Sequence, residues 1–190
     1  MTMRAFCGVA IAFLYAGAAP AADDLMVEAY RRGPAVEVVA RATLRAPHEL
    51  VWRTLTDYDR LATFIPGLLK SRVIERRGPA AIIEQFGEVR FLLFSFPIEV
   101  TLASVEKPPD EIEVHALKGT LKQLEGGYRI ERGRDPGALV LHWRGLIQPA
   151  VTLPPLLGEV VMRANIEDQF AGMVREIERR EAERAVQAGR

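Results

Sequence analysis

The chain has 190 residues, 49% of them hydrophobic, and its 25 basic residues balance 25 acidic ones. This length is typical of one domain with a sizeable core. With a formal net charge of zero, the sequence lacks the excess of positive charge that is typical of nucleic-acid-binding domains. The single cysteine, Cys7, excludes an intramolecular disulfide. The composition therefore predicts a domain that is stabilised by its hydrophobic core.

The first 21 residues have the pattern of a cleavable signal peptide. Arg4 supplies a positive start, residues 5–18 are almost entirely apolar, and Ala19 and Ala21 are small residues at the positions that a signal peptidase reads. The apolar run is shorter than the ~20 residues that a membrane-spanning helix needs. We predict cleavage before Ala22 and a periplasmic or secreted domain of residues 22–190.

The first part of the mature chain predicts one strand and one or two short helices. Residues 23–30 mix polar and apolar side chains and are expected to form a loose lead-in. Residues 36–44 alternate with a period of two, which is typical of a half-buried strand. Pro47 is tolerated in the first turn of a helix and opens the next element. Asp57 and Asp59 are expected to cap or end helices.

The segment from residue 68 to residue 149 is rich in strand patterns separated by turns. Residues 91–103 give the clearest strand, whose apolar face carries Phe94, Phe96 and Ile98. The doublet Gly126-Gly127 is interpreted as a turn before a short strand that holds Tyr128 and Ile130. Residues 138–148 form the last strand, with Trp143 in register with Leu139 and Leu141. Consecutive short strands with tight turns favour an antiparallel meander.

A long amphipathic helix is predicted over residues 156–186. Its apolar residues recur at steps of three and four, which places them on one stripe. After Ile177 the sequence becomes highly charged, so this end is expected to be solvated and held by ion pairs at helical spacing. The stripe consists of Val161, Met162, Ile166, Phe170, Met173 and Ile177.

These elements predict an α+β fold. A stripe on a long helix has to be buried, and an antiparallel sheet offers a matching apolar face. Because sheets twist, we expect a curved antiparallel sheet that wraps around the C-terminal helix, with one or two short helices after the first strand. The space between sheet and helix can be filled by side chains or can form a cavity.

Residues 45–76 contain a set of short motifs that together resemble a known superfamily. These motifs are Ala46-Pro47 with Val51-Trp52, Asp57-Tyr58, Phe64-Ile65-Pro66-Gly67 and Ser71-Arg72-Val73. The chain is similar there to START-like proteins, also termed SRPBCC, and especially to their polyketide cyclase/dehydrase and coenzyme Q-binding branch, which have the helix-grip fold. The resemblance implies a cavity for an apolar ligand such as a lipid, sterol or quinone, and it implies no universal catalytic residue. The export signal departs from many branch members.

The candidate ligand contacts are apolar and aromatic side chains from the predicted sheet face, the helix stripe and the segment 57–67. The same residues are also candidates for a filled core, and periodicity does not separate the two interpretations. No cofactor is predicted. The candidates are Tyr58, Phe64, Ile65, Phe94, Phe96, Ile98, Tyr128, Trp143, Met162, Ile166, Phe170 and Met173.

Catalytic and metal-binding patterns are weak in this sequence. His48, His115 and His142 lack the spacing of a zinc motif, and no nucleophile elbow or phosphate-binding loop is present. Glu84, Phe86 and Glu88 alternate along the predicted strand and so lie on the same face of it. The two glutamates could serve as cavity acids, but we favour the interpretation that this face is exposed to solvent.

Three functions remain open at this stage. The first is an exported binding or carrier protein for a hydrophobic small molecule, which implies possible transient contact with a membrane and no nucleic-acid partner. The second is an enzyme of the cyclase or dehydratase type that uses a cavity carboxylate. The third is a protein-interaction module with a filled core. A cavity of ligand size between sheet and helix would separate the first two from the third.

Overall fold

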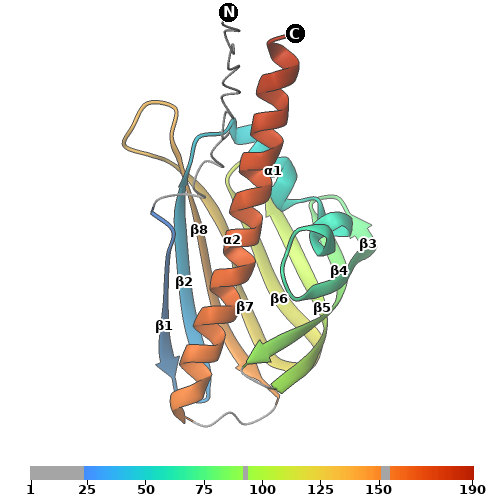
Figure 1. Ribbon diagram of the computed structural model, residues 1–190. Coiled ribbons are helices and arrows are strands. Elements are labelled where there is room, and N and C mark those ends of the chain that lie inside the picture. Colours follow the sequence, from blue (N-terminus) through green and yellow to red (C-terminus); the bar gives the residue numbers. More distant parts are fainter. Residues whose placement is uncertain (1–23, 92–93, 151–154) are drawn as a thin grey trace, which may run out of the picture.

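The computed structural model describes residues 24–91, 94–150 and 155–190. Within them, an antiparallel sheet of eight strands curves around one long C-terminal helix (Figure 1). The sheet order is β1-β2-β8-β7-β6-β5-β4-β3. This confirms the predicted helix-grip architecture. The elements are β1 (Met26–Arg32), β2 (Ala35–Leu44), α1 (His48–Leu55), the 3-10 helix η1 (Tyr58–Thr63), β3 (Leu68–Arg77), β4 (Ala80–Phe91), β5 (Phe94–Lys107), β6 (Glu111–Gly119), β7 (Leu121–Arg132), β8 (Leu139–Pro149) and α2 (Pro155–Ala188).

Strand β2 confirms the prediction from alternating residues. The five apolar positions of its predicted inner face, from Val36 to Leu44, are all buried, and Val38 and Ala40 have no exposed surface. The strand pairs with β8, where Leu141 and Trp143 are also buried. The inner face of β2, together with β1, therefore forms the part of the core on which α2 packs.

Strand β1 corrects the prediction of a loose lead-in over residues 23–30. Met26 pairs with Arg41 and the ladder continues to Arg32, so this segment forms an edge strand on β2. Only Val27 is buried, and the many charged neighbours hide the alternation in the sequence. Its strand structure depends on the exposed edge of β2 and on contact with α2.

The doublet Gly126-Gly127 lies inside β7, and the predicted turn is wrong. Strand β7 is flanked by β6 and β8 at this point. A Cβ atom on Gly126 would lie 2.3 Å from the carbonyl oxygen of Arg144, and one on Gly127 would lie 2.0 Å from that of Ile112. The two glycines permit a close approach of three backbones in a strongly curved sheet.

The predicted strand over residues 91–103 is divided between two elements. Strand β4 ends at Phe91, where it pairs with Phe94 at the start of β5. Residues 92–93 lie outside the described part of the chain. Strand β5 then continues to Lys107, four residues beyond the predicted end, because β6 pairs with it as far as Glu111.

Helix α2 confirms the predicted apolar stripe. All six stripe residues are buried, as is Val174. The charged end carries ion pairs such as Arg184 with Glu181, as expected from their spacing. Among the described helices, none combines the length and the apolar character that crossing a membrane requires.

Candidate ligand cavity

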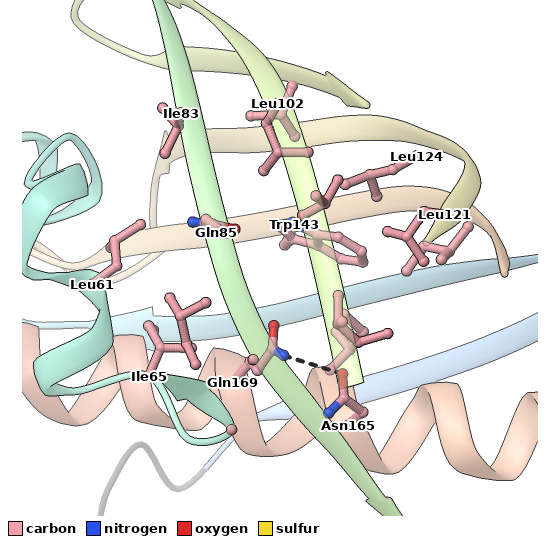
Figure 2. Close-up of a pocket in the computed structure, with 18 of the residues that line it drawn as sticks. Leu61, Ile65, Ile83, Gln85, Leu102, Leu121, Leu124, Trp143, Asn165 and Gln169 are labelled. Atoms are coloured by element: carbon pink, nitrogen blue, oxygen red, sulfur yellow. Dashed lines mark hydrogen bonds between the residues drawn. The ribbon is translucent and has the colours of Figure 1, made fainter. Parts of the chain in front are cut away.

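A cavity of about 210 Å³ lies between the curved sheet and α2. This is far more space than the ~10–15 Å³ that a single water needs. Residues from β3 to β8 line one side, and α1, η1, the loop after η1 and α2 line the rest (Figure 2). Most of the lining is aliphatic, including Leu61, Ile83, Leu102, Leu121 and Leu124.

Eight of the twelve candidate ligand contacts line this cavity. They come from five different elements and from the loop after η1, so the fold brings together residues that are more than 100 positions apart. Their role in binding remains a prediction. These eight are Tyr58, Ile65, Ile98, Tyr128, Trp143, Met162, Ile166 and Met173.

The other four candidates are phenylalanines that do not contribute to the described lining. Phe64 is half-buried beneath the guanidinium of Arg180, 5.5 Å from its ring centre. Phe96 is 40% exposed, and Phe170 is buried in the core without reaching the cavity. The side chain of Phe94 is outside the described residues. The α2 stripe is wider than the cavity, because part of it packs on β1 and β2.

Polar side chains in the lining were missed by a search for apolar faces. Gln169 donates from Nε2 to Oδ1 of Asn165 over 3.1 Å, one turn earlier on α2 (Figure 2). On β4, Gln85 donates from Nε2 to the Ser71 hydroxyl over 3.3 Å. Their positions in the sequence could have identified them. Gln85 lies on the same face of its strand as Ile83, and Asn165 directly precedes Ile166.

Two tyrosines line the cavity in different ways. The Tyr58 hydroxyl forms a hydrogen bond of 2.9 Å with the hydroxyl of Ser104, which is fully buried. Burial raises the pKa of Tyr58, and burial alone raises that of Tyr128. Both phenols therefore stay protonated at neutral pH and can donate hydrogen bonds.

The two candidate acids occupy different positions. Glu84 accepts from the guanidinium of Arg72 over 2.7 Å and is absent from the described lining, as the solvent-facing interpretation requires. Glu88 borders the cavity and accepts from the Ser95 hydroxyl over 2.8 Å. Across the described residues, no three His, Cys, Asp or Glu side chains are grouped so that they could hold a metal ion.

The segment 57–67 packs against α2 through a close contact at Gly172. A Cβ atom at Gly172 would lie 2.7 Å from the carbonyl oxygen of Phe64 and 2.5 Å from Cδ of Pro66. The glycine thus allows the loop to lie directly on the helix. This contact holds Ile65 against the cavity.

Asp57 occupies the predicted N-cap position of η1, but neither aspartate forms a capping hydrogen bond with its side chain. Neither α1 nor η1 has a side-chain cap. Asp57 instead accepts from Arg180 on α2 over 2.8 Å, and Asp59 accepts from the backbone N–H of Val73 over 2.7 Å. Both side chains therefore fix the position of the segment relative to α2 and β3.

The ion pair between Asp57 and Arg180 is part of a network centred on Glu176. The Glu176 side chain is only 7% exposed. It accepts from Arg179 over 2.7 and 2.9 Å and from Arg180 over 2.7 Å. Hydrogen bonds from Arg179 and then Arg180 lower the pKa of Glu176 from 4.5 to about 2. The charged end of α2 is thereby linked to the segment beside the cavity.

Substitution of Glu176 by glutamine is expected to destabilise the protein in a pH-dependent way. The folded-state pKa lies below the unfolded value, so the carboxylate stabilises the fold above pH ~4.5, and this contribution is lost as the pH falls toward about 2. At pH 7, Glu176→Gln should lower the free energy of unfolding by about 1–2 kcal/mol. The difference from wild type should shrink in urea unfolding measured at decreasing pH.

Glu183 provides the matched control for this experiment. It also pairs with Arg179, but its side chain is 59% exposed. Glu183→Gln should change stability by less than about 0.5 kcal/mol at every pH. A loss of stability in Glu176→Gln that stays constant from pH 7 to pH 2 would show that packing, not charge, is responsible.

The curved sheet closed by a C-terminal helix, with an apolar cavity between them, defines a helix-grip protein of the START-like class. Residues 44–185 match the family described as polyketide cyclase / dehydrase and lipid transport. This match covers most of the chain, which therefore belongs to that family. None of the curated proteins compared with the sequence matches it significantly.

Solved structures with a similar fold share little sequence with this chain. A STAR-related lipid transfer protein from Xanthomonas axonopodis has a TM-score of 0.67 and 13% identity, covering 84% of this chain and 97% of its own. The Zhui aromatase/cyclase from a Streptomyces species has a TM-score of 0.63 and 20% identity, covering 77% and 95%. A START superfamily protein from Mycobacterium smegmatis has a TM-score of 0.61 and 12% identity, covering 75% and 97%. At these identities the likeness concerns the fold.

Proposed function

We propose that this protein binds and carries a hydrophobic small molecule, such as a lipid or a quinone, in the cavity between the sheet and α2. The observation that carries the proposal is the chemistry of the lining. Among the described residues that line it, none is basic and one, Glu88, is acidic. A pocket of this kind gains affinity by removing apolar surface from water.

The expected gain from burial is sufficient for useful affinity. Each buried methylene contributes about 0.8 kcal/mol, so a ligand that buries roughly ten carbon atoms gains about 8 kcal/mol before the cost of association is subtracted. Met162 and Met173 contribute flexible side chains to the lining, which can adapt to the shape of the ligand. A lipid transfer protein among the similar solved structures supports the same function.

The direct test is to identify what the purified protein carries. Native mass spectrometry should show an added mass, and organic extraction should release a neutral apolar compound in amounts close to one per chain. Ligand-free protein that takes up no lipid or quinone from added stocks would contradict the carrier function.

A cyclase-like or dehydratase-like enzyme is the second candidate, because Glu88 borders the cavity and an aromatase/cyclase is among the similar structures. The two functions differ in their response to Glu88→Gln. A carrier should retain its ligand in this variant, whereas an enzyme that uses Glu88 as an acid should lose turnover by about 100-fold or more. Glu84→Gln is the control, because Glu84 pairs with Arg72 outside the lining.

The third alternative, an interaction module, requires an interior that is filled by side chains. A cavity of about 210 Å³ argues against it. We also propose that the protein is exported and that residues 1–21 are removed, since their sequence has the pattern of a signal peptide. The intact mass of protein from the periplasm or the medium should then begin at Ala22. Retention of the full-length mass in the cytoplasm would contradict export.

A further inference from the structure

Two side-chain donors lie next to each other on the sheet wall of the cavity. Tyr128 on β7 is paired directly with Trp143 on β8, and both line the cavity. Directly opposed residues of neighbouring strands project from the same face with Cβ atoms about 5 Å apart. The phenol and the indole are therefore neighbours on one surface.

Neither donor has a hydrogen-bond partner within the described part of the chain. Burial is the only influence on the pKa of Tyr128, and no hydrogen bond contributes to it, in contrast to Tyr58, which is paired with Ser104. The described residues contain no fully buried side-chain nitrogen or oxygen that lacks a partner. Tyr128 Oη and Trp143 Nε1 must therefore reach free space, and the space beside them is the cavity.

The position of the indole is fixed by the residue two places further along β8. A Cβ atom on Gly145 would lie 2.3 Å from Cη2 and 2.6 Å from Cζ2 of Trp143. The ring therefore covers Gly145, and only glycine allows this placement. A donor that is held rigidly in a largely apolar cavity loses little entropy when it binds an acceptor.

The charge of the lining indicates which acceptor suits these donors. No basic residue in the described part of the chain lines the cavity to neutralise an anion. The amides of Asn165 and Gln169 on α2 are already bonded to each other. A neutral carbonyl oxygen can accept two hydrogen bonds through its two lone pairs and has no proton that needs an acceptor of its own. It therefore matches two free donors.

We propose that the cavity selects neutral apolar molecules that carry a carbonyl oxygen, and that this oxygen accepts hydrogen bonds from the Tyr128 hydroxyl and the Trp143 indole N–H. The proposal rests on the carrier function and narrows its ligand class to ketones, quinones and esters. An apolar cavity supplies affinity, and the donor pair supplies selection between molecules of equal size.

The test compares 2-acetylnaphthalene with 2-isopropylnaphthalene, which have nearly the same shape but differ in the carbonyl oxygen. Isothermal titration calorimetry should show that Tyr128→Phe weakens binding of the ketone about fivefold, while binding of the hydrocarbon changes less than about twofold. Tyr30→Phe is the matched control, because the Tyr30 hydroxyl lies on the exposed surface of β1 and donates to Glu28. It should leave both affinities unchanged.

The wild-type protein gives a second readout that does not depend on any variant. The infrared carbonyl stretch of the bound ketone should lie at lower wavenumber than in hexane, because hydrogen bonds weaken the C=O bond. Of the two tryptophan indole N–H resonances, that of Trp143 should move downfield with the ketone and not with the hydrocarbon. A hexane-like carbonyl stretch, together with an unchanged affinity ratio in Tyr128→Phe, would overturn the proposal and leave the carrier function intact. Failure of the wild-type protein to bind either probe or any extracted lipid would overturn both.

Discussion

Gly127→Ala is expected to cost at least about 3 kcal/mol of folding free energy, the largest effect that we predict for one methyl group. The new Cβ atom would lie 2.0 Å from the carbonyl oxygen and 3.0 Å from the carbonyl carbon of Ile112. These are backbone atoms of β6, so no side-chain rotation can relieve the overlap. Relief requires β6 and β7 to separate at the point where the sheet curves. Urea unfolding followed by circular dichroism measures the loss.

Gly78→Ala is the appropriate comparison, since it adds the same methyl group at a site without neighbours. Gly78 lies in the turn between β3 and β4, with φ at 56° and no atom within 4 Å of an added Cβ. Its cost should be limited to the left-handed backbone conformation, about 1 kcal/mol. Equal losses in the two variants would mean that backbone conformation, and not the contact with Ile112, explains the need for glycine in β7.

The glycine doublet also shows where local reasoning from sequence reaches its limit. Two adjacent glycines favour a turn when only neighbouring residues are considered. Glycine is required at these two positions because the backbone of Ile112 and of Arg144, on other strands, approaches too closely for a side chain. Asp57 is a similar case, because its partner Arg180 is 123 positions away in the sequence. Contacts of this range leave no pattern in a local window.

Elements with strong periodicity were predicted well, because their pattern reflects burial on one face. Strand β2 and the stripe of α2 are examples, and the order of elements followed from them. The cavity was harder to predict, because its lining and the filled core use the same residue types. Phe170 and Met173 belong to one stripe, yet only Met173 reaches the cavity. Part of the stripe packs on β1 and β2 and part faces the cavity, and the helical period does not show where one part ends and the other begins.

A register shift at the start of β7 also made the cavity lining difficult to predict from the sequence. Leu121 and Leu124 differ in strand parity, but both line the cavity. The pairing with β8 shifts register between Leu121 and Gln123, and such a bulge changes the face on which the following residues lie. A strict period of two would have assigned one of these leucines to the outer face.

Filling the cavity from β7 is expected to abolish binding without loss of the fold. Leu124 is partly buried, lines the cavity and pairs with Ile147, which also lines it. In Leu124→Trp the indole can extend into existing free space, so stability should stay within about 1 kcal/mol of wild type. Affinity for 2-isopropylnaphthalene should fall at least about tenfold, equivalent to about 1.4 kcal/mol. Calorimetry measures the affinity and thermal unfolding measures the stability.

Leu117→Trp on β6 makes the same change outside the cavity and serves as the control. Leu117 is 53% exposed and is not among the lining residues. Affinity in this variant should equal that of wild type. If Leu124→Trp binds the probe as tightly as wild type while Leu117→Trp does not, the ligand site is on the outer face of the sheet. Loss of binding in Leu124→Trp alone would place the ligand between the sheet and α2, because the two leucines differ chiefly in the face from which they project.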